Sequence, residues 1–242
     1  SDNGLLIYQT GNVQVGSKLS LLDHSGKTLG VIGDVAEYGP FCISPDNKRI
    51  AVGVFDQKSR NNDIWIIEVN RGFKTHLTFD PASDGNPVWS PDGNRVVFSS
   101  NRKGRNDLYI KSASGAASEE ILYESAEPKF PWDWSPDGKY LAYNAVGKDN
   151  DIWMLPMEAN GQRSSKSPFP FLATEFNEGE AVFSPNGDWI AYTSNESGQA
   201  EVYVRPFPGP GGKFQISSEG GKTPIWPRDG KEIFYVSLND TK

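Results

Sequence analysis

The chain has 242 residues and a formal net charge of −7, which argues against a nucleic-acid or anionic-membrane partner because those surfaces attract clustered Lys and Arg. The single cysteine, Cys42, excludes an internal disulfide framework and a cysteine-based zinc site. Apolar residues make up only 36%, and the 25 glycines and 17 prolines are typical of many short strands joined by tight turns.

A turn-forming phrase recurs along the whole chain. Proline presets its backbone, Asp or Asn accepts hydrogen bonds from the following amides, and Gly tolerates positive φ. The copies begin near residues 1, 44, 90, 135, 184 and 227, at intervals of 43 to 49 residues. They read Ser1-Asp2-Asn3-Gly4, Ser44-Pro45-Asp46-Asn47, Ser90-Pro91-Asp92-Gly93, Ser135-Pro136-Asp137-Gly138, Ser184-Pro185-Asn186-Gly187 and the degenerate Pro227-Arg228-Asp229-Gly230. A period of this length indicates propeller blades or helical repeats.

Short β-rich runs surround each turn, and they favour propeller blades over helical repeats. One run precedes each internal turn (strand A) and another follows it (strand B), which predicts hairpins such as 88–89 with 96–98. About 17 residues later an acid–aliphatic–aromatic phrase predicts a third strand (C). Its copies are Asp63-Ile64-Trp65, Asp107-Leu108-Tyr109, Asp151-Ile152-Trp153 and Glu201-Val202-Tyr203, with a drifted copy at Lys18-Leu19-Ser20. A weaker fourth strand (D) follows, first at Thr28-Leu29 and last at 214–216.

Four strands per repeat predict an all-β fold, a β-propeller of four-stranded antiparallel blades. We expect residues 1–242 to form a single propeller domain or a propeller fragment. The first repeat has no strand A, and the last ends after a strand B. The ring would have five blades if the termini close it, and otherwise the chain would be part of a propeller of six or more blades. Unpaired blade edges would favour self-association.

The repeats resemble the WD40-like (PD40) repeats of TolB-type propellers. The resemblance rests on Trp89-Ser90-Pro91-Asp92-Gly93, on 98–102 followed by Asp107-Leu108-Tyr109, and on Ser135-Pro136-Asp137-Gly138. A narrower likeness, in 71–73, 77–80 and 203–208, is to the propeller segments C-terminal to bacterial membrane-bound serine/threonine kinases. It implies a sensor or interaction module in an extracytoplasmic location. TolB-like propellers also occur fused to serine peptidases, so a gating propeller with its catalytic domain outside this chain is the alternative.

The sequence contains no convincing catalytic motif. A hydrolase nucleophile elbow needs Gly-x-Ser-x-Gly, and no serine has that spacing. The two histidines are His24, in a polar turn, and His76, on a predicted outer strand. Cys42, between apolar neighbours, reads as a buried and inert thiol. The run 209–213 lacks the glycine and hydroxyl of a phosphate loop. We therefore expect no enzyme, no catalytic residue and no cofactor.

One acidic cluster is a candidate metal site, and the sequence does not decide whether it binds a metal ion. Asp149-Asn150-Asp151 offers oxygen ligands for calcium but lacks the spacing of an EF-hand loop. Asp151 also matches the acid of the C-strand phrase in other repeats, which favours a structural role.

The segments leading into each strand A are acidic. They carry ten acids, from Asp34 to Glu219, against Lys129 and Lys222. In a closed propeller these segments would surround one mouth of the channel and attract a cationic ligand, although loops of an acidic chain are acidic in any case. The residues predicted to bind a protein or small-molecule ligand there are Glu37, Tyr38, Asp84, Glu127, Phe130, Glu178 and Glu180. The aromatic members could equally pack between blades.

Overall fold

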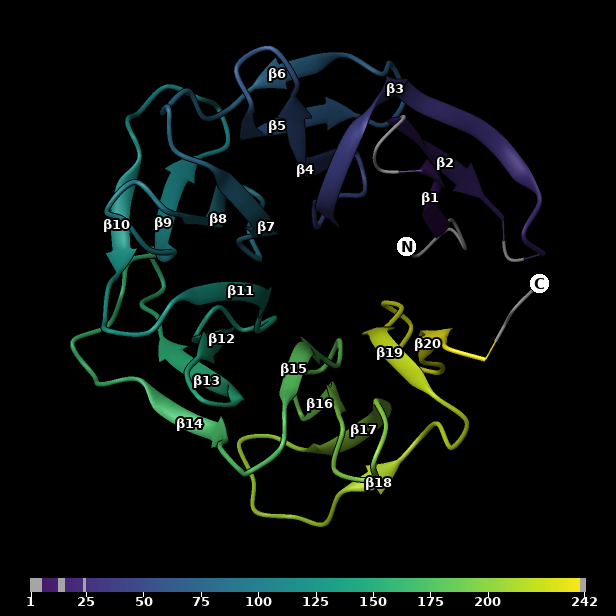
Figure 1. Ribbon diagram of the computed structural model, residues 1–242, viewed down its shortest axis with the longest axis vertical. Helices are drawn as coiled ribbons and strands as arrows, with labels where there is room; N and C mark the ends of the chain where they lie inside the picture. The colour runs from purple at the N-terminus through teal and green to yellow at the C-terminus, as the bar shows by residue number, and fades with distance from the viewer. Residues whose placement is uncertain (1–5, 13–15, 24, 240–242) are drawn as a thin grey trace. The chain divides into compact units, whose positions relative to one another are not determined.

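The computed structural model describes residues 6–12, 16–23 and 25–239, which contain twenty strands and no helix (Figure 1). With no helix among these residues, none is available to cross a membrane. The chain divides into two compact units, residues 1–124 and 125–242.

The first unit contains two antiparallel sheets. The first sheet has six strands in sequential order. They are β1 (Leu6–Asn12), β2 (Gly16–Leu22), β3 (Thr28–Ile43), β4 (Arg49–Asp56), β5 (Asn61–Glu68) and β6 (Lys74–His76). The second sheet has four strands, also paired in sequential order. They are β7 (Asp84–Trp89), β8 (Arg95–Ser100), β9 (Asp107–Ser112) and β10 (Glu120–Tyr123).

The second unit repeats the four-stranded sheet twice and ends in a hairpin. Its first sheet consists of β11 (Lys129–Trp134), β12 (Tyr140–Val146), β13 (Asn150–Pro156) and β14 (Phe169–Leu172). Its second sheet consists of β15 (Glu178–Phe183), β16 (Trp189–Ser194), β17 (Glu201–Pro206) and β18 (Phe214–Gln215). The hairpin is β19 (Gly221–Ile225) with β20 (Phe234–Ser237). The four-stranded antiparallel blade predicted from the repeats is confirmed.

One boundary differs from the expectation. The sequence predicts a D strand near Thr28 and a separate A strand at 41–43, with a loop between them. Instead β3 runs without interruption for 16 residues. It pairs with β2 as far as Ala36 and with β4 from Glu37 onward. Glu37 therefore lies within a strand and not in a loop. Because residues 28–39 contain no proline, backbone pairing passes directly from one partner strand to the next.

The repeated phrase forms a similar turn in its five described copies, whereas the copy at residues 1–4 lies outside the described residues. In the fourth copy the Gly138 N–H donates to the Ser135 carbonyl at 2.8 Å, and Gly138 has a φ of 76°. The Ser135 hydroxyl donates to Asp137 at 2.7 Å and accepts from the Tyr140 N–H at 2.9 Å. Partial burial opposes ionisation of Asp137, but hydrogen bonds from Lys139 and Ser135 hold its pKa below the usual value. These aspartates are turn acceptors, as the sequence predicts.

The cores lie where the first strand of one sheet packs on the sheet before it. Strand β7 packs on β3, β4 and β5, while β15 packs on β11, β12 and β13, and β19 packs on β15, β16 and β17. The second strand of each four-stranded sheet is covered on both faces. In β8, Val96, Val97 and Phe98 are fully buried. Stacked aromatic pairs join second and third strands, with ring centroids 5.8 Å apart for Tyr192 and Tyr203.

Candidate functional site

Asp84, predicted to bind a ligand, is instead sealed inside the first unit. It begins β7 and has an exposed fraction of 0%. The Arg102 guanidinium donates to both of its carboxylate oxygens at 3.2 Å. The guanidinium carbon also lies 4.4 Å from the centroid of the Tyr109 ring. Burial raises the pKa of Asp84, against the opposing effects of Ser100 and Arg102. Asp84 therefore offers no exposed carboxylate, because it is buried and paired with Arg102, and its predicted role in ligand binding stays a prediction.

Glu178 occupies the corresponding first position of β15 and is also buried. The Thr174 hydroxyl donates to its Oε1, and the Asn144 side-chain amide donates to its backbone carbonyl at 2.6 Å. Burial raises the pKa of Glu178, and the negative charges of Asp151 and Glu196 raise it further. Glu178 therefore presents no exposed charge, and its predicted role in ligand binding stays a prediction.

Glu180 holds two neighbouring sheets of the second unit together. It lies at a bulge of β15 with a φ of 56°, which is unfavourable for a residue other than glycine. The Thr193 hydroxyl donates to its Oε2 at 2.7 Å. The Thr223 N–H of β19 donates to the same oxygen, and the Thr223 hydroxyl donates to Oε1 at 3.2 Å. Thr223 has a φ of 54° at the corresponding bulge of β19. The carboxylate is thus a structural clamp between β15 and β19.

The predicted aromatics are not freely exposed. Tyr38 is buried, its hydroxyl donates to the Asp34 carbonyl at 2.8 Å, and the Lys74 ammonium lies 5.7 Å from its ring. The burial of Tyr38 in a core cluster favours the packing alternative, and its predicted role in binding stays a prediction. Phe130, in β11, is half-buried. Glu127 is exposed in the loop before β11, where its carboxylate accepts a 3.3 Å hydrogen bond from the Ser125 hydroxyl.

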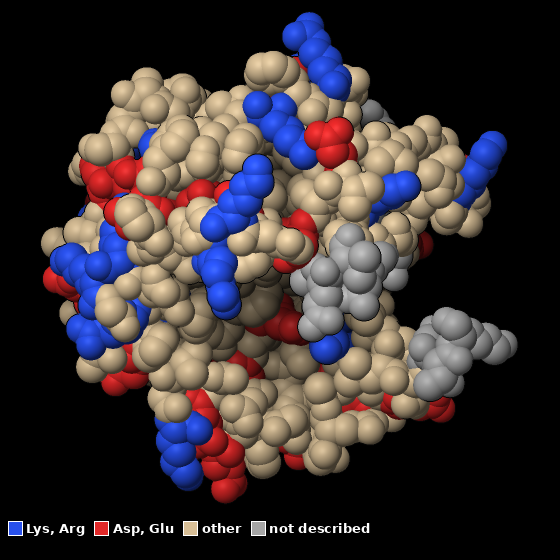
Figure 2. Space-filling model, turned by 45° about the horizontal axis from the view of Figure 1, so that its top comes forward, with Lys and Arg blue, Asp and Glu red and all other residues tan. Residues whose placement is uncertain are grey.

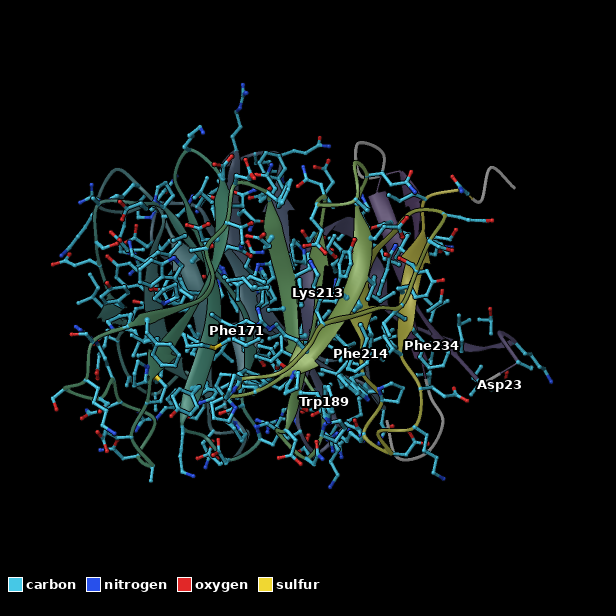
Figure 3. All side chains as sticks on the ribbon, turned by 90° about the horizontal axis from the view of Figure 1, so that it is seen from below. Asp23, Phe171, Trp189, Lys213, Phe214 and Phe234 are labelled. Atoms are coloured by element: carbon cyan, nitrogen blue, oxygen red, sulfur yellow. The ribbon has the colours of Figure 1, made fainter. Side chains whose placement is uncertain are left out.

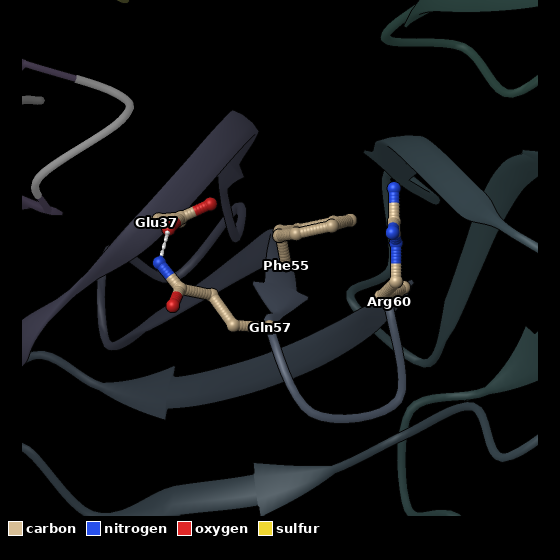
Figure 4. A pocket seen from close by; sticks show the side chains of 4 residues that line it. All are labelled: Glu37, Phe55, Gln57 and Arg60. Carbon is tan, nitrogen blue, oxygen red and sulfur yellow. Dashed lines mark hydrogen bonds between the residues drawn. The ribbon is translucent and has the colours of Figure 1, made fainter.

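A hollow of about 320 Å³ lies beside Glu37, the remaining predicted residue. Its lining is Glu37 from β3, Phe55 from β4, and Gln57 and Arg60 from the loop after β4 (Figure 4). Glu37 and Phe55 are paired in the β3–β4 ladder, and the Gln57 side-chain amide donates to the Glu37 carboxylate. The Phe55 ring is 39% exposed. This hollow offers a carboxylate, an amide, an aromatic ring and a guanidinium to one ligand.

The loop that carries Gln57 and Arg60 is ordered by its own first residue. The Asp56 carboxylate accepts hydrogen bonds from the Lys58 N–H and the Ser59 hydroxyl, both at 3.0 Å. These bonds lower the pKa of Asp56 and keep it ionised. Arg60 then adopts a φ of 55° before β5 begins. Phe55 and Gln57 were not predicted as site residues, because residues 50–54 of β4 are all apolar or glycine and alternation cannot assign a face.

The acids of the C-strand phrase have structural partners. Glu201 accepts from the Ser217 hydroxyl and from the Gly220 N–H at 2.8 Å, which fixes the loop after β18. Asp63 lies 3.1 Å from the His76 Nε2, and the His76 ring stacks on Trp65 at 4.2 Å. His24 lies outside the described residues, and Cys42 is half-buried where a buried thiol was expected. Within the described ranges, no three His, Cys, Asp or Glu side chains gather as a metal site would require.

Charges of both signs are interspersed on the face that Figure 2 shows, where blue and red side chains lie next to one another. Several pairs are in contact, including Lys103 with Glu124 and Lys111 with Glu119, each at 2.8 Å. The Lys103–Glu124 pair is exposed and contributes little to stability, whereas the Lys111 side chain is only 6% exposed. An acidic channel mouth remains a prediction. Two of the carboxylates on which it depends, Asp84 and Glu178, are buried.

Comparisons with known proteins agree on the fold. A family model described as the TolB β-propeller domain (PD40) matches residues 35–167, more than half of the chain. The structure is similar to TolB from Acinetobacter baumannii, with a TM-score of 0.77 and 20% identity, over 98% of this chain and 59% of that one.

Two curated proteins are related in sequence. One is the uncharacterized protein Atu1656 of Agrobacterium fabrum, 27% identical over 157 residues, which are 62% of this chain and 52% of that protein. The other is the uncharacterized peptidase YuxL of Bacillus subtilis, 25% identical over 175 residues, with 58% of this chain and 26% of that protein covered. This chain thus spans about half or less of these relatives. The PD40 match and the repeated blades together show that the chain belongs to the TolB β-propeller family.

Proposed function

We propose that this chain is a non-catalytic binding or scaffold propeller that takes a protein or small-molecule ligand at the hollow of Glu37, Phe55, Gln57 and Arg60. The observation that carries the proposal is the contrast between this hollow and the other predicted site residues. Asp84, Glu178 and Glu180 lie in contacts that hold strands, whereas Phe55 is exposed near the end of β4 and Arg60 is exposed on the ordered loop that follows. Exposed aromatic and arginine side chains are the residue types that most often dominate protein interfaces.

The test compares two double substitutions, each of which removes one aromatic ring and one guanidinium group. Phe55→Ala with Arg60→Ala changes the hollow, whereas Phe73→Ala with Arg71→Ala removes an exposed ring and guanidinium from the turn before β6. Immobilised protein of each type is exposed to extract from the source organism, and captured proteins and small molecules are quantified by mass spectrometry. We expect at least tenfold less of a specific ligand on the first variant and an unchanged amount on the second. Equal capture by both would contradict the hollow as the binding site.

A narrower form of the proposal places the chain in a receptor-like serine/threonine kinase as its sensor. Its support is the likeness of 71–73, 77–80 and 203–208 to the propeller segments of such kinases. The same resemblance supports an extracytoplasmic location as part of this proposal. The sequence of the parent gene product tests both features: a kinase domain and a membrane span upstream would support them, and their absence would end this version.

The second candidate is an accessory propeller that gates access to a serine peptidase domain outside this chain. A specific finding favours it, since the chain is 25% identical to part of a protein named as a peptidase and covers 26% of that protein. A nucleophile elbow with its triad downstream in the parent gene product would support this function. A parent without such a domain would exclude it.

A further inference from the structure

The loops that follow β8 and β16 have closely similar backbones. Each loop has six residues and begins with an asparagine, Asn101 in the first unit and Asn195 in the second. The asparagine carbonyl accepts a hydrogen bond from the glycine N–H three residues later, at 2.8 Å in one loop and 2.9 Å in the other. The asparagine side chain accepts another from the residue before the first strand of the same sheet, at 3.0 Å and 2.9 Å. The second residue of the loop therefore has the same place in both sheets, and it is Arg102 in the first and Glu196 in the second.

The ion pair at this place is reversed between the two sheets. In the first unit an Arg102 nitrogen lies 3.8 Å from a carboxylate oxygen of Glu119, the residue before β10. In the second unit the Lys213 ammonium pairs with Glu196 and lies 5.6 Å from the centroid of the Tyr203 ring. Lys213, labelled in Figure 3, is the residue before β18, and β10 and β18 have the same register against their third strands. The negative residue of one sheet thus stands where the other sheet has its cation.

The reversal leaves Glu178 without the cation that its counterpart has. Asp84 and Glu178 both begin the first strand of their sheet, and each pairs with a serine of the second strand. Arg102 donates to both carboxylate oxygens of Asp84, but the corresponding residue in the second unit is the acid Glu196. The Oε2 atom of Glu178 is buried and has no hydrogen-bond partner among the described residues. Such a carboxylate has lost its hydration without gaining a compensating charge, which is unfavourable.

We propose that the second unit binds a ligand's guanidinium group at this place, between the carboxylates of Glu178 and Glu196 and over the ring of Tyr203. The same framework accepts a guanidinium group in the first unit, where Arg102 lies against Asp84 and a third-strand ring. The aromatic platform is shared as well, since stacked rings of the second and third strands have centroids 6.1 Å apart in the first unit and 5.8 Å apart in the second. A guanidinium group can stack on such a ring and donate to two carboxylates at once, whereas an ammonium group is a compact point charge.

The proposed site is accessible from the loop surface. The Glu196 side chain is 18% exposed, close to the 15% of Arg102. The Lys213 side chain is 50% exposed, so its ammonium can turn outward when a ligand takes the position beside Glu196. All residues of the site belong to the sheet β15–β18 and its loops, and the inference does not depend on the hollow at Glu37.

A short peptide with one arginine tests the proposal. The probe is acetyl-Gly-Arg-Gly-amide, and its binding to the whole chain is measured by isothermal titration calorimetry at low salt. The same peptide with citrulline, which has the shape of arginine without its charge, should bind at least tenfold more weakly. Glu178→Gln removes the carboxylate charge but keeps an oxygen for the Thr174 hydroxyl, and it should weaken probe binding at least tenfold without lowering Tm. A lysine peptide that binds as tightly as the probe would contradict a guanidinium site.

Transplanting the ion pair of the first unit gives a second variant. Glu196→Arg with Lys213→Glu places a guanidinium group of the chain itself beside Glu178. We expect this variant to lose probe binding and to unfold at a Tm about 2–4 °C higher, because the buried carboxylate gains a partner. The control reverses an exposed pair, Lys103→Glu with Glu124→Lys, and should change neither quantity. Probe binding by the transplanted variant that equals that of the unaltered chain would overturn the proposal.

Two further ligands separate the possible sources of the cation. If methylguanidine binds as tightly as the peptide, the site suits a small-molecule ligand, and if the peptide binds more tightly, it suits an arginine side chain of a protein; both results support the site. Calcium ions that raise the Tm of the unaltered chain but not that of Glu178→Gln would assign the site to a metal ion and contradict the proposal.

Discussion

Replacing Arg102 by methionine tests whether the buried carboxylate of Asp84 depends on a single cation. Asp84 is fully buried, and the Arg102 side chain is only 15% exposed. Methionine fills part of the space but leaves the negative charge without its guanidinium. The hydrogen bonds of Ser100 and Thr78 to Asp84 would remain.

The expected loss of stability is large for the substitution of a single loop residue. Removing one partner of a buried ion pair costs about 3–5 kcal/mol. Because Arg102 is partly exposed and two hydroxyl partners of Asp84 persist, we expect the lower end, about 3 kcal/mol in the free energy of unfolding. For a chain of this length that corresponds to a fall of about 6–12 °C in Tm.

Urea unfolding at pH 7, followed by tryptophan fluorescence, measures this change. Arg71→Met is the matched control, since the Arg71 side chain is 80% exposed and its nearest carboxylate oxygen, from Glu68, is 3.9 Å away. We expect the control to change stability by less than about 0.5 kcal/mol. Adding Asp84→Asn to Arg102→Met should restore at least about 1 kcal/mol, because it removes the unpaired charge. The reasoning fails if Arg102→Met matches the control, or if the second substitution only adds to the loss.

Three further predictions concern stability. Gly138→Ala should cost about 1 kcal/mol in urea unfolding because its φ is 76°, whereas Gly212→Ala, also without close neighbours but free of positive φ, should not destabilise; equal effects would contradict the turn argument. Asp133, bridging β11 to β15 through the Phe183 N–H, has a pKa raised to about 7 by burial. The contribution of Asp133 to the free energy of unfolding is complete below pH 4. It falls by up to about 4 kcal/mol as pH rises to 7, because the native state keeps the proton on Asp133 to a higher pH than the unfolded state does. Asp133→Asn should flatten that pH dependence of urea unfolding, and an unchanged slope would refute it. Glu180→Ala should cost about 2 kcal/mol by thermal unfolding through the lost hydrogen bonds to β19, and a neutral effect would show that the clamp contributes nothing.

The outer surface of the second unit shows how aromatic side chains serve packing as well as recognition. Trp189 of β16 and Phe214 of β18 lie beside one another (Figure 3), with ring centroids 6.1 Å apart. Phe214 nevertheless remains 57% exposed. An exposed ring alone therefore does not identify a binding site, and the case for Phe55 depends on its neighbours Glu37 and Arg60.

Site assignment was less predictable than the fold because it depends on distant partners. Arg102 lies 18 residues from Asp84, and Thr223 lies 43 residues from Glu180. Sequence reasoning grouped these acids by their common position before a strand, but position does not reveal a partner in a neighbouring sheet. The hollow likewise joins Glu37 to a loop some twenty residues away.

The sequence by itself determined the blades, because their information is local. The four turns that begin at Ser44, Ser90, Ser135 and Ser184 are each closed within six residues by the serine, an acid or amide, and a residue with positive φ, and alternating short runs specify the strands. Only the tertiary structure decided which carboxylates are buried and that β3 continues through a predicted loop. Burial and pairing are properties of both partners, and the free energy of a charge or a strand edge depends on what the rest of the chain brings to it.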